Sequence, residues 1–247
     1  MDLAAYFARI GYDGDATPTL ETLRAMQRAH FYNVPFENLD IKRGTRIQVD
    51  DAVNFDKVVT RRRGGFCLEL TGLFATALRQ IGFRVDMIGA RVLFEGKLSA
   101  PMSHMTLIVH LDERWIADVG FGGRIAAPLR LDARDDQRVD GRTYVVAEDG
   151  GHYIVTTTEP ATGSIAYVFV LQPRAFAEFA PVCEWLQTSP DSRFTKGDIV
   201  SLATPTGRLT LAQGKFIAID GESRDERAVE SEDETRQILR ERFRLTL

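Results

Sequence analysis

The chain has 247 residues and a formal net charge of −4, with 44% hydrophobic and 27% charged residues, which are ordinary values for a globular protein. The mild acidity argues against nucleic acid as a main partner, because nucleic-acid-binding domains usually carry basic faces. No apolar run approaches the roughly 20 residues that span a bilayer, so no membrane partner is expected.

The amino-terminal segment makes a poor signal peptide, because Asp2 and Arg9 flank only a short apolar stretch. Without an export signal, a reducing cytoplasm is the expected location. The chain has two cysteines, Cys67 and Cys183, and in that compartment both are expected to be free thiols.

Apolar residues at helical spacing dominate the first third of the chain. They predict a helix over residues 3–10 that stops at Gly11. A second helix is predicted to start with Thr17 as N-cap and Pro18 in its first turn, and to run toward His30.

A loop and a third helix follow. Pro35 is expected to keep Val34 extended. The third helix is predicted to begin at or near Cys67 and to end at Gly82, a residue that suits the C′ position. One apolar stripe runs along it, made of Leu70, Phe74, Leu78 and Ile81.

From about residue 84 the chain consists of short segments rich in β-branched and aromatic residues, which predict an antiparallel barrel or sheet. Turn residues such as Asp112, Gly141 and Gly150–Gly151 separate these segments. The predicted strands cover residues 84–94, 104–111, 114–121, 142–148, 152–159 and 165–173.

The last part of the chain mixes strands with a terminal helix. Residues 181–194 are expected to form a polar connection. Ser231 and Glu234 make a capping-box pattern that opens the terminal helix. The charged run over residues 220–234 is expected to be a solvated loop and helix start. The predicted strands are residues 198–205, 207–213 and 215–221.

The stretch RRRGGFCLEL at residues 61–70 places Cys67 where a nucleophile could be activated. A helix N-terminus and the neighbouring Arg61–Arg63 would both favour the thiolate. Gly64 and Gly65 allow the tight backbone approach that a nucleophile at a loop-to-helix turn requires. The simpler interpretation is a small hydrophobe at a helix start, but the motif as a whole favours the nucleophile.

A thiol nucleophile needs an imidazole and a group that orients it. His30 ends a helix and His152 lies in an expected turn, so neither is favoured. His104 and His110 bracket one predicted strand and point to the same face, roughly 20 Å apart. Only one of these two can therefore serve the site, and the strand pattern alone leaves both open.

Asp118 is the most conspicuous carboxylate, because it is an isolated acid in an apolar strand, where a charge is costly unless it is paired. The alternative is a structural Asp that accepts backbone N–H bonds. A tight hairpin at Asp112–Glu113 predicts Asp118 opposite Leu107, roughly 10 Å along the strand from His104. The two side chains then meet only if residues 101–104 fold back or a bulge shifts the register.

The other candidates for chemistry are weaker. Cys183 has no glycine or histidine beside it and is expected to be structural. GFGG at residues 120–123 could bring backbone amides to an anion, or could simply form a turn. No cluster of His, Cys or acidic residues has metal-ligand spacing, so no metal is expected.

The order Cys, His, Asp and the phrases RGGFCLE, DVGFG and VPFENLD resemble the arylamine N-acetyltransferase family, and the likeness extends to YFARIGYDG, IGFRVDMIGARV and TSPDSRF. It implies an α+β fold with a cysteine-peptidase-like core and an interdomain helix. Its three parts would be an N-terminal helical bundle (1–84), an antiparallel β-barrel (85–190) and a C-terminal α/β lid (191–247).

The resemblance also implies the chemistry. Members of the family transfer an acetyl group from acetyl-CoA to the nitrogen of arylamines or arylhydrazines by a ping-pong route. By motif, Cys67 would be the nucleophile, His104 its base and Asp118 the acid that orients the imidazole. The other matched residues are Phe36 and Phe121 for the acceptor and Gly122 and Gly123 for the cofactor.

Two departures and three alternatives accompany this expectation. Thr71 stands where the family usually has Asn, and the C-terminus looks short, which affects how the lid covers the cofactor. The alternatives are an amide synthase that releases a carrier-bound polyketide as a macrolactam, a cysteine hydrolase with the same triad, and a binding module without activity.

Overall fold

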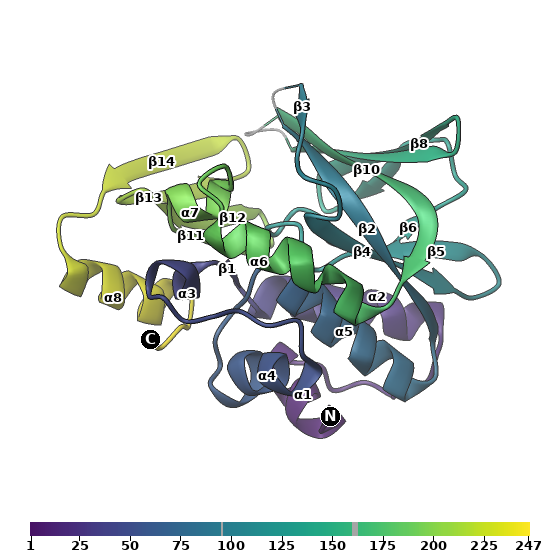
Figure 1. The fold of residues 1–247 in the computed structure, drawn as a ribbon, viewed down its shortest axis with the longest axis horizontal. Helices are drawn as coiled ribbons and strands as arrows, with labels where there is room; N and C mark the ends of the chain where they lie inside the picture. The colour runs from purple at the N-terminus through teal and green to yellow at the C-terminus, as the bar shows by residue number, and fades with distance from the viewer. Residues whose placement is uncertain (95, 160–162) are drawn as a thin grey trace.

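Helices form most of the first 81 residues and lie together beneath a curved sheet (Figure 1). The computed structural model describes residues 1–94, 96–159 and 163–247. Within these ranges, every helix is too short or too polar to cross a membrane. The first helices are α1 (Leu3–Ile10), α2 (Leu20–Asn33), α3 (Leu39–Lys42), α4 (Asp51–Phe55), the π-helical turn η1 (Asp56–Thr60) and α5 (Cys67–Ile81).

The predicted first and third helices are confirmed. Gly11 ends α1 and Gly82 ends α5, both in the left-handed conformation at φ 71° and 108°, which glycine adopts without steric cost. The predicted N-cap of α2 is wrong. Thr19, rather than Thr17, is the N-cap, because its side-chain oxygen accepts the Thr22 N–H at 3.2 Å.

The β-barrel is a nine-stranded antiparallel sheet in the order β6-β5-β4-β2-β10-β9-β8-β7, with β3 paired to β2. It curls until it is nearly closed (Figure 1), which confirms the predicted antiparallel barrel. Its strands are β2 (Arg84–Phe94), β3 (Lys97–Leu98), β4 (His104–His110), β5 (Arg114–Ala117), β6 (Leu129–Arg130), β7 (Gln137–Val139), β8 (Arg142–Asp149), β9 (His152–Glu159) and β10 (Gly163–Arg174).

A second sheet of five strands, in the order β1-β11-β12-β13-β14, brings the two halves of the chain together. β1 (Phe36–Glu37) comes from the N-terminal part and pairs antiparallel with β11, Phe36 opposite Ser201. The other elements here are η2 (Phe176–Phe179), α6 (Ala180–Thr188), α7 (Arg193–Lys196), β11 (Ile199–Thr204), β12 (Gly207–Ala212), β13 (Lys215–Asp220), β14 (Ser223–Ala228) and α8 (Glu232–Arg242).

Two expectations about the C-terminal part are wrong. Most of the predicted polar connection is α6, which buries Cys183 and Leu186 on one face. Part of the predicted solvated loop is the edge strand β14, whose six residues are all exposed. An edge strand needs backbone pairing on one side only, and charged side chains protect its free side. The terminal helix does open at Ser231, whose hydroxyl accepts the Glu234 N–H.

The largest apolar cluster joins the helices to the barrel. It contains Leu70, Leu73 and Leu78 of α5 together with Leu107 and Val109 of β4. Full burial of such a side chain contributes about 1.5–3 kcal/mol, so this cluster fixes α5 against the barrel. The division of the chain at 84/85 and 190/191 stays a prediction.

Candidate active site

Cys67 is the first residue of α5 and only 3% exposed. Its Sγ lies 3.5 Å from the Ser103 carbonyl oxygen, which accepts the thiol hydrogen bond. The segment around Gly120 packs directly onto this helix start. A Cβ at Gly120 would lie 2.8 Å from Cys67 Cα and 2.5 Å from Thr71 Oγ1, so only glycine allows this approach.

His104 and Asp118 meet beside the thiol. His104 Nε2 lies 2.7 Å from Asp118 Oδ2, and both residues are at most 2% exposed. Asp118 Oδ1 accepts the Gly120 N–H at 2.9 Å. Because Asp118 occupies Nε2, Nδ1 is the ring nitrogen available to Cys67, whose proximity is one cause of the raised pKa of His104.

The predicted hairpin register is wrong by one residue. His110 pairs with Arg114 and Leu107 with Ala117, so the connection between β4 and β5 has three residues rather than two. In addition, β5 ends at Ala117, earlier than predicted. Asp118 therefore follows the end of the strand and reaches His104 at the start of β4.

The electrostatics of His104 follow from these neighbours. Burial lowers the pKa of the imidazole, but the charge and hydrogen bond of Asp118, with a further contribution from Cys67, outweigh burial and raise it to about 10. His104 is therefore an imidazolium at neutral pH. Its positive charge beside the sulfur is the arrangement that activates thiol nucleophiles.

The arginines before Cys67 have a different role from the predicted one. Arg61 pairs with Asp56 on the surface at 2.8 Å. Arg63 is buried and bonds the carboxylates of Glu37 and Asp40 at 2.7 and 2.9 Å. Carboxylates thus neutralise Arg61 and Arg63, Arg62 is exposed, and His104 provides positive charge beside the thiol.

The other histidines lie outside this group. His110 bonds Asp86 at 2.7 Å at the opposite end of β4, so the structure selects His104 from the two that the sequence left open. His30 is fully buried with Nδ1 2.8 Å from the Tyr6 hydroxyl, and burial lowers its pKa to about 3. His152 is exposed, as expected for a turn.

The second thiol is structural, as predicted. Cys183 is 2% exposed and its Sγ lies 3.7 Å from the Ile47 carbonyl oxygen. Burial raises the pKa of this thiol to about 12. Both cysteines are free.

Aromatic rings flank the Cys67–His104–Asp118 group on two sides. The Phe121 ring centroid lies 5.1 Å from that of His104. Phe36 lies with Phe194 at 6.1 Å, and Phe194 in turn contacts Phe66, the residue before Cys67, at 5.9 Å. The two phenylalanines matched by motif thus sit in the aromatic surroundings of the thiol and its imidazole.

Sequence reasoning missed Tyr167. This residue of β10 is fully buried, its ring centroid lies 5.0 Å from that of His104, and its hydroxyl lies 3.2 Å from Thr106 Oγ1. Burial, together with the charge of the nearby Asp118 carboxylate, raises the pKa of this hydroxyl well above 10. Tyr167 therefore stays neutral beside the His104–Asp118 pair.

Comparison with known proteins identifies the family of this chain. Residues 19–247 match the family model described as N-acetyltransferase. An arylamine N-acetyltransferase of the pineal gland of Gallus gallus is 34% identical over all of this chain and 95% of its own length. The chain belongs to the arylamine N-acetyltransferase family. A Salmonella typhimurium relative named arylamine N-acetyltransferase / N-hydroxyarylamine O-acetyltransferase is 37% identical over 87% of this chain and 78% of its own.

Solved structures of the family share the whole fold. The arylamine N-acetyltransferase of M. smegmatis superposes with a TM-score of 0.94 at 30% identity, over all of this chain and 93% of that one. The Mycobacterium marinum enzyme in complex with CoA superposes with a TM-score of 0.92 at 28% identity, over 99% and 93% of the two chains. The α+β fold expected from the resemblance is confirmed.

The glycines after Asp118 lie in the connection between β5 and β6 of the barrel, where it contacts β11 of the second sheet. Gly122 and Gly123 have φ values of 61° and 73°, and the Gly122 carbonyl accepts a hydrogen bond from Ser201 Oγ at 3.2 Å. A Cβ at Gly123 would lie 3.3 Å from the Ala203 nitrogen, whereas one at Gly122 would meet no described atom within 4 Å. The turn is thus packed against Ala203 at Gly123 and open at Gly122.

The departure at Thr71 leaves a polar atom without a partner. Thr71 is fully buried, and among the described residues its Oγ1 has no hydrogen-bond partner. Its hydroxyl faces the backbone of Gly120. In this family member, the position that usually carries an amide thus holds a small group pressed between α5 and the turn after Asp118.

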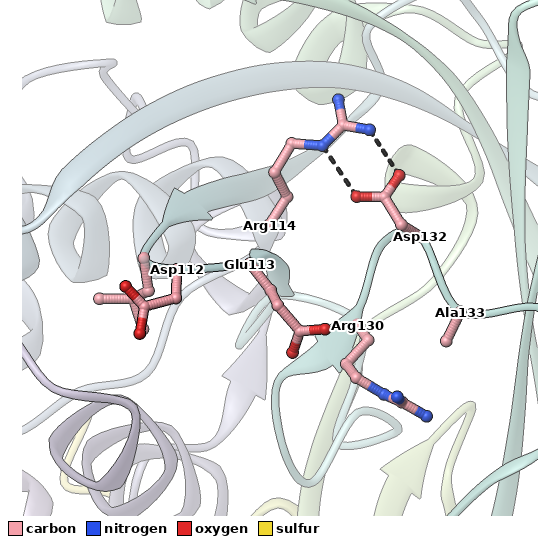
Figure 2. Close-up of a pocket in the computed structure, with 7 residues that line it drawn as sticks. Asp112, Glu113, Arg114, Arg130, Asp132 and Ala133 are labelled. Atoms are coloured by element: carbon pink, nitrogen blue, oxygen red, sulfur yellow. Dashed lines mark hydrogen bonds and ion pairs between the residues drawn. The ribbon is translucent and has the colours of Figure 1, made fainter.

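Figure 2 shows a surface pocket at the other end of the β4–β5 hairpin, with the Arg114–Asp132 ion pair at its edge. None of the residues matched to the family's site lies in it. Its lining consists of Leu111, Asp112, Glu113, Arg114, Arg130, Asp132 and Ala133.

Proposed function

We propose that this protein transfers an acetyl group from acetyl-CoA to the nitrogen of arylamines or arylhydrazines through an acetylated Cys67. The observation that carries the proposal is the buried Cys67–His104–Asp118 group at the start of α5, in a chain that belongs to the arylamine N-acetyltransferase family. A thiol, an imidazole and an orienting carboxylate are the parts that nucleophilic acyl transfer requires.

In the first half of the reaction, the Cys67 sulfur, with its proton on the His104 imidazolium, attacks the carbonyl carbon of the thioester as a thiolate. A new C–S bond forms on Cys67, the C–S bond to CoA breaks, and the departing thiolate takes the proton of the His104 imidazolium. One thioester replaces another, so this exchange has little thermodynamic cost. Asp118 holds the imidazole in place through Nε2.

In the second half, the amine nitrogen attacks the acetyl group on Cys67. His104 takes a proton from the nitrogen, a C–N bond forms, and Cys67 leaves as a thiolate beside the restored imidazolium. Weakly basic aromatic amines suit this step because they are unprotonated at neutral pH. The Tyr167 ring packs against the imidazole at 5.0 Å and would help to hold it in place.

The contacts with both substrates belong to the proposal. Phe36 and Phe121 would hold the aromatic acceptor, since both lie in the ring-lined surroundings of the site. Gly122 and Gly123 would face acetyl-CoA. The open side of Gly122 suits this, because a residue without a side chain lets an extended acyl-donor chain approach the backbone.

The location is also proposed rather than observed. Two free, buried thiols, one of them in the candidate site, fit a reducing cytoplasm.

Initial-rate kinetics test the proposed reaction. CoA release and formation of the acetylated amine would be measured while acetyl-CoA and 4-anisidine are varied. We expect equal amounts of both products and parallel double-reciprocal plots, which are the pattern of a ping-pong route. CoA release without acetylated amine would indicate a hydrolase, and no reaction with free acetyl-CoA would favour a carrier-bound acyl donor.

A further inference from the structure

Five buried charged side chains form a network beside the start of α5. They come from five segments (β1, α3, η1, the loop before α5, and α5 itself), and each is between 0% and 5% exposed. This buried charge cluster consists of Glu37, Asp40, Lys57, Arg63 and Glu69.

Lys57 links the two halves of the cluster. Its Nζ lies 2.7 Å from Asp40 Oδ2 and 2.8 Å from Glu69 Oε1. On the far side, Arg63 bonds Asp40 and Glu37. Glu69 thus depends on Lys57 for its ion pair, whereas Asp40 has a second cation. A buried carboxylate that loses its only cation is costly.

The remaining oxygen of Glu69 accepts a backbone hydrogen bond. The Phe66 N–H donates to Glu69 Oε2 at 3.0 Å. Phe66 is the N-cap residue of α5, and a phenylalanine side chain has no acceptor with which to cap the helix. The carboxylate also lies against Gly65, where a Cβ would come within 3.0 Å of Glu69 Oε2.

These contacts form one path from Lys57 to the nucleophile. Lys57 holds Glu69, Glu69 holds the peptide N–H of Phe66, and the next residue is Cys67. We propose that Lys57 is a positioning residue for acyl transfer, acting through Glu69 on the backbone that aims the Cys67 sulfur at His104. This inference rests on the proposed function, because the acyl transfer that Lys57 would serve is the reaction proposed above. The contacts from Lys57 to Cys67 do not depend on that function.

Three variants separate positioning from a merely structural role. Lys57→Met leaves Glu69 without its cation. The double variants Lys57→Met/Glu69→Gln and Lys57→Met/Glu69→Met both remove the two charges. Only the glutamine variant keeps a side-chain oxygen that can accept the Phe66 N–H. Lys215→Met is the matched control, because Lys215 pairs with Glu226 at the same 2.7 Å on an exposed edge.

We expect Lys57→Met to lower kcat for amine acetylation about 10- to 100-fold, with KM for the amine within about threefold, since misplacing a reacting group by about 1 Å can cost about 100-fold. The Gln double variant should recover to within about fivefold of the wild type. The Met double variant should stay as slow as Lys57→Met. Lys215→Met should match the wild type.

Alkylation of Cys67 by iodoacetamide gives a second readout that needs no acetyl-CoA. The alkylation rates should follow the same order: slow for Lys57→Met and the Met double variant, close to the wild type for the Gln double variant, and equal to the wild type for Lys215→Met. If the alkylation rates of the five proteins follow that order but the wild type is not acetylated by acetyl-CoA, the proposed function fails while the positioning role stands. Equal acetylation and alkylation rates for the two double variants would overturn the inference. So would variants that differ in melting temperature but not in either rate. If Lys57→Met does not fold, the comparison of the double variants decides alone.

Discussion

Strand β4 carries a histidine at each end, and each bonds a carboxylate at 2.7 Å. The two pairs differ in their surroundings. The side chains of His104 and Asp118 are 2% and 0% exposed, whereas those of His110 and Asp86 are 20% and 32% exposed. The buried pair also has a thiol beside it, and the half-buried pair lies at the far end of the strand. Pair geometry alone thus does not distinguish the candidate site, whereas burial beside the Cys67 thiol does.

The largest effect should come from replacing one histidine at a time. His104→Gln should lower kcat/KM for acetyl transfer about 10²- to 10⁴-fold, the usual contribution of a general acid–base residue. His110→Gln should change it less than about twofold, because His110 lies at the opposite end of β4 from Cys67 and bonds only Asp86 among the described residues. Steady-state kinetics of the two purified variants decide this. A comparable loss in both would break the distinction between the pairs.

The buried pair should also shape the pH dependence of stability. The pKa of His104 rises from an ordinary 6.5 to about 10 on folding, so the folded protein binds this proton more tightly. The resulting stabilisation is fully present below pH about 6.5 and is lost as the pH rises toward about 10.

Melting temperatures between pH 6 and pH 10 would test this dependence. Wild type should lose stability across that window, and His104→Gln should lose less. The same slope in both proteins would mean that His104 is not the group responsible.

Tyr167→Phe should have a smaller effect, because it removes a polar group near Asp118 but leaves Cys67, His104 and Asp118 in place. We expect kcat to fall about 3- to 10-fold, a change of about 1 kcal/mol in the barrier, with KM unchanged. The pH profile of kcat should shift as well, because the surroundings of Asp118, and with them its interaction with His104, change. An unchanged kcat and pH profile would show that the phenol only fills space.

The smallest effect is expected at Thr71. A buried hydroxyl without a partner costs about 1–3 kcal/mol relative to a satisfied group. Thr71→Val keeps the shape and removes the hydroxyl, so it should raise the free energy of unfolding by about 1 kcal/mol and the melting temperature by about 2–4 °C. Denaturant unfolding and calorimetry measure both. A lower melting temperature would show that the hydroxyl has a stabilising partner.

Local signals predicted the elements that carry the site. Helical spacing and Gly82 predicted α5, and the position of Cys67 at its start followed from the RGG segment. The run of β-branched and other apolar residues over 104–111 predicted β4. These predictions held because periodicity and capping depend on residues a few positions apart.

Contacts between distant residues could not be predicted in the same way. Whether Asp118 reaches His104 depends on a three-residue connection in place of two, a choice that the turn sequence leaves open. Tyr167 lies 49 positions after Asp118, and the partners of Arg63 precede it by 23 and 26 positions. Only the folded chain shows that Arg61 and Arg63 pair with carboxylates.

Intact-protein mass spectrometry tests the central claim most directly. The wild type and Cys67→Ala would each be mixed with acetyl-CoA, and 4-anisidine would then be added. We predict one acetyl group on the wild type, none on the variant, and loss of that group when the amine is added. A folded wild type that gains no acetyl group, or a Cys67→Ala variant that gains the same one, would contradict the account.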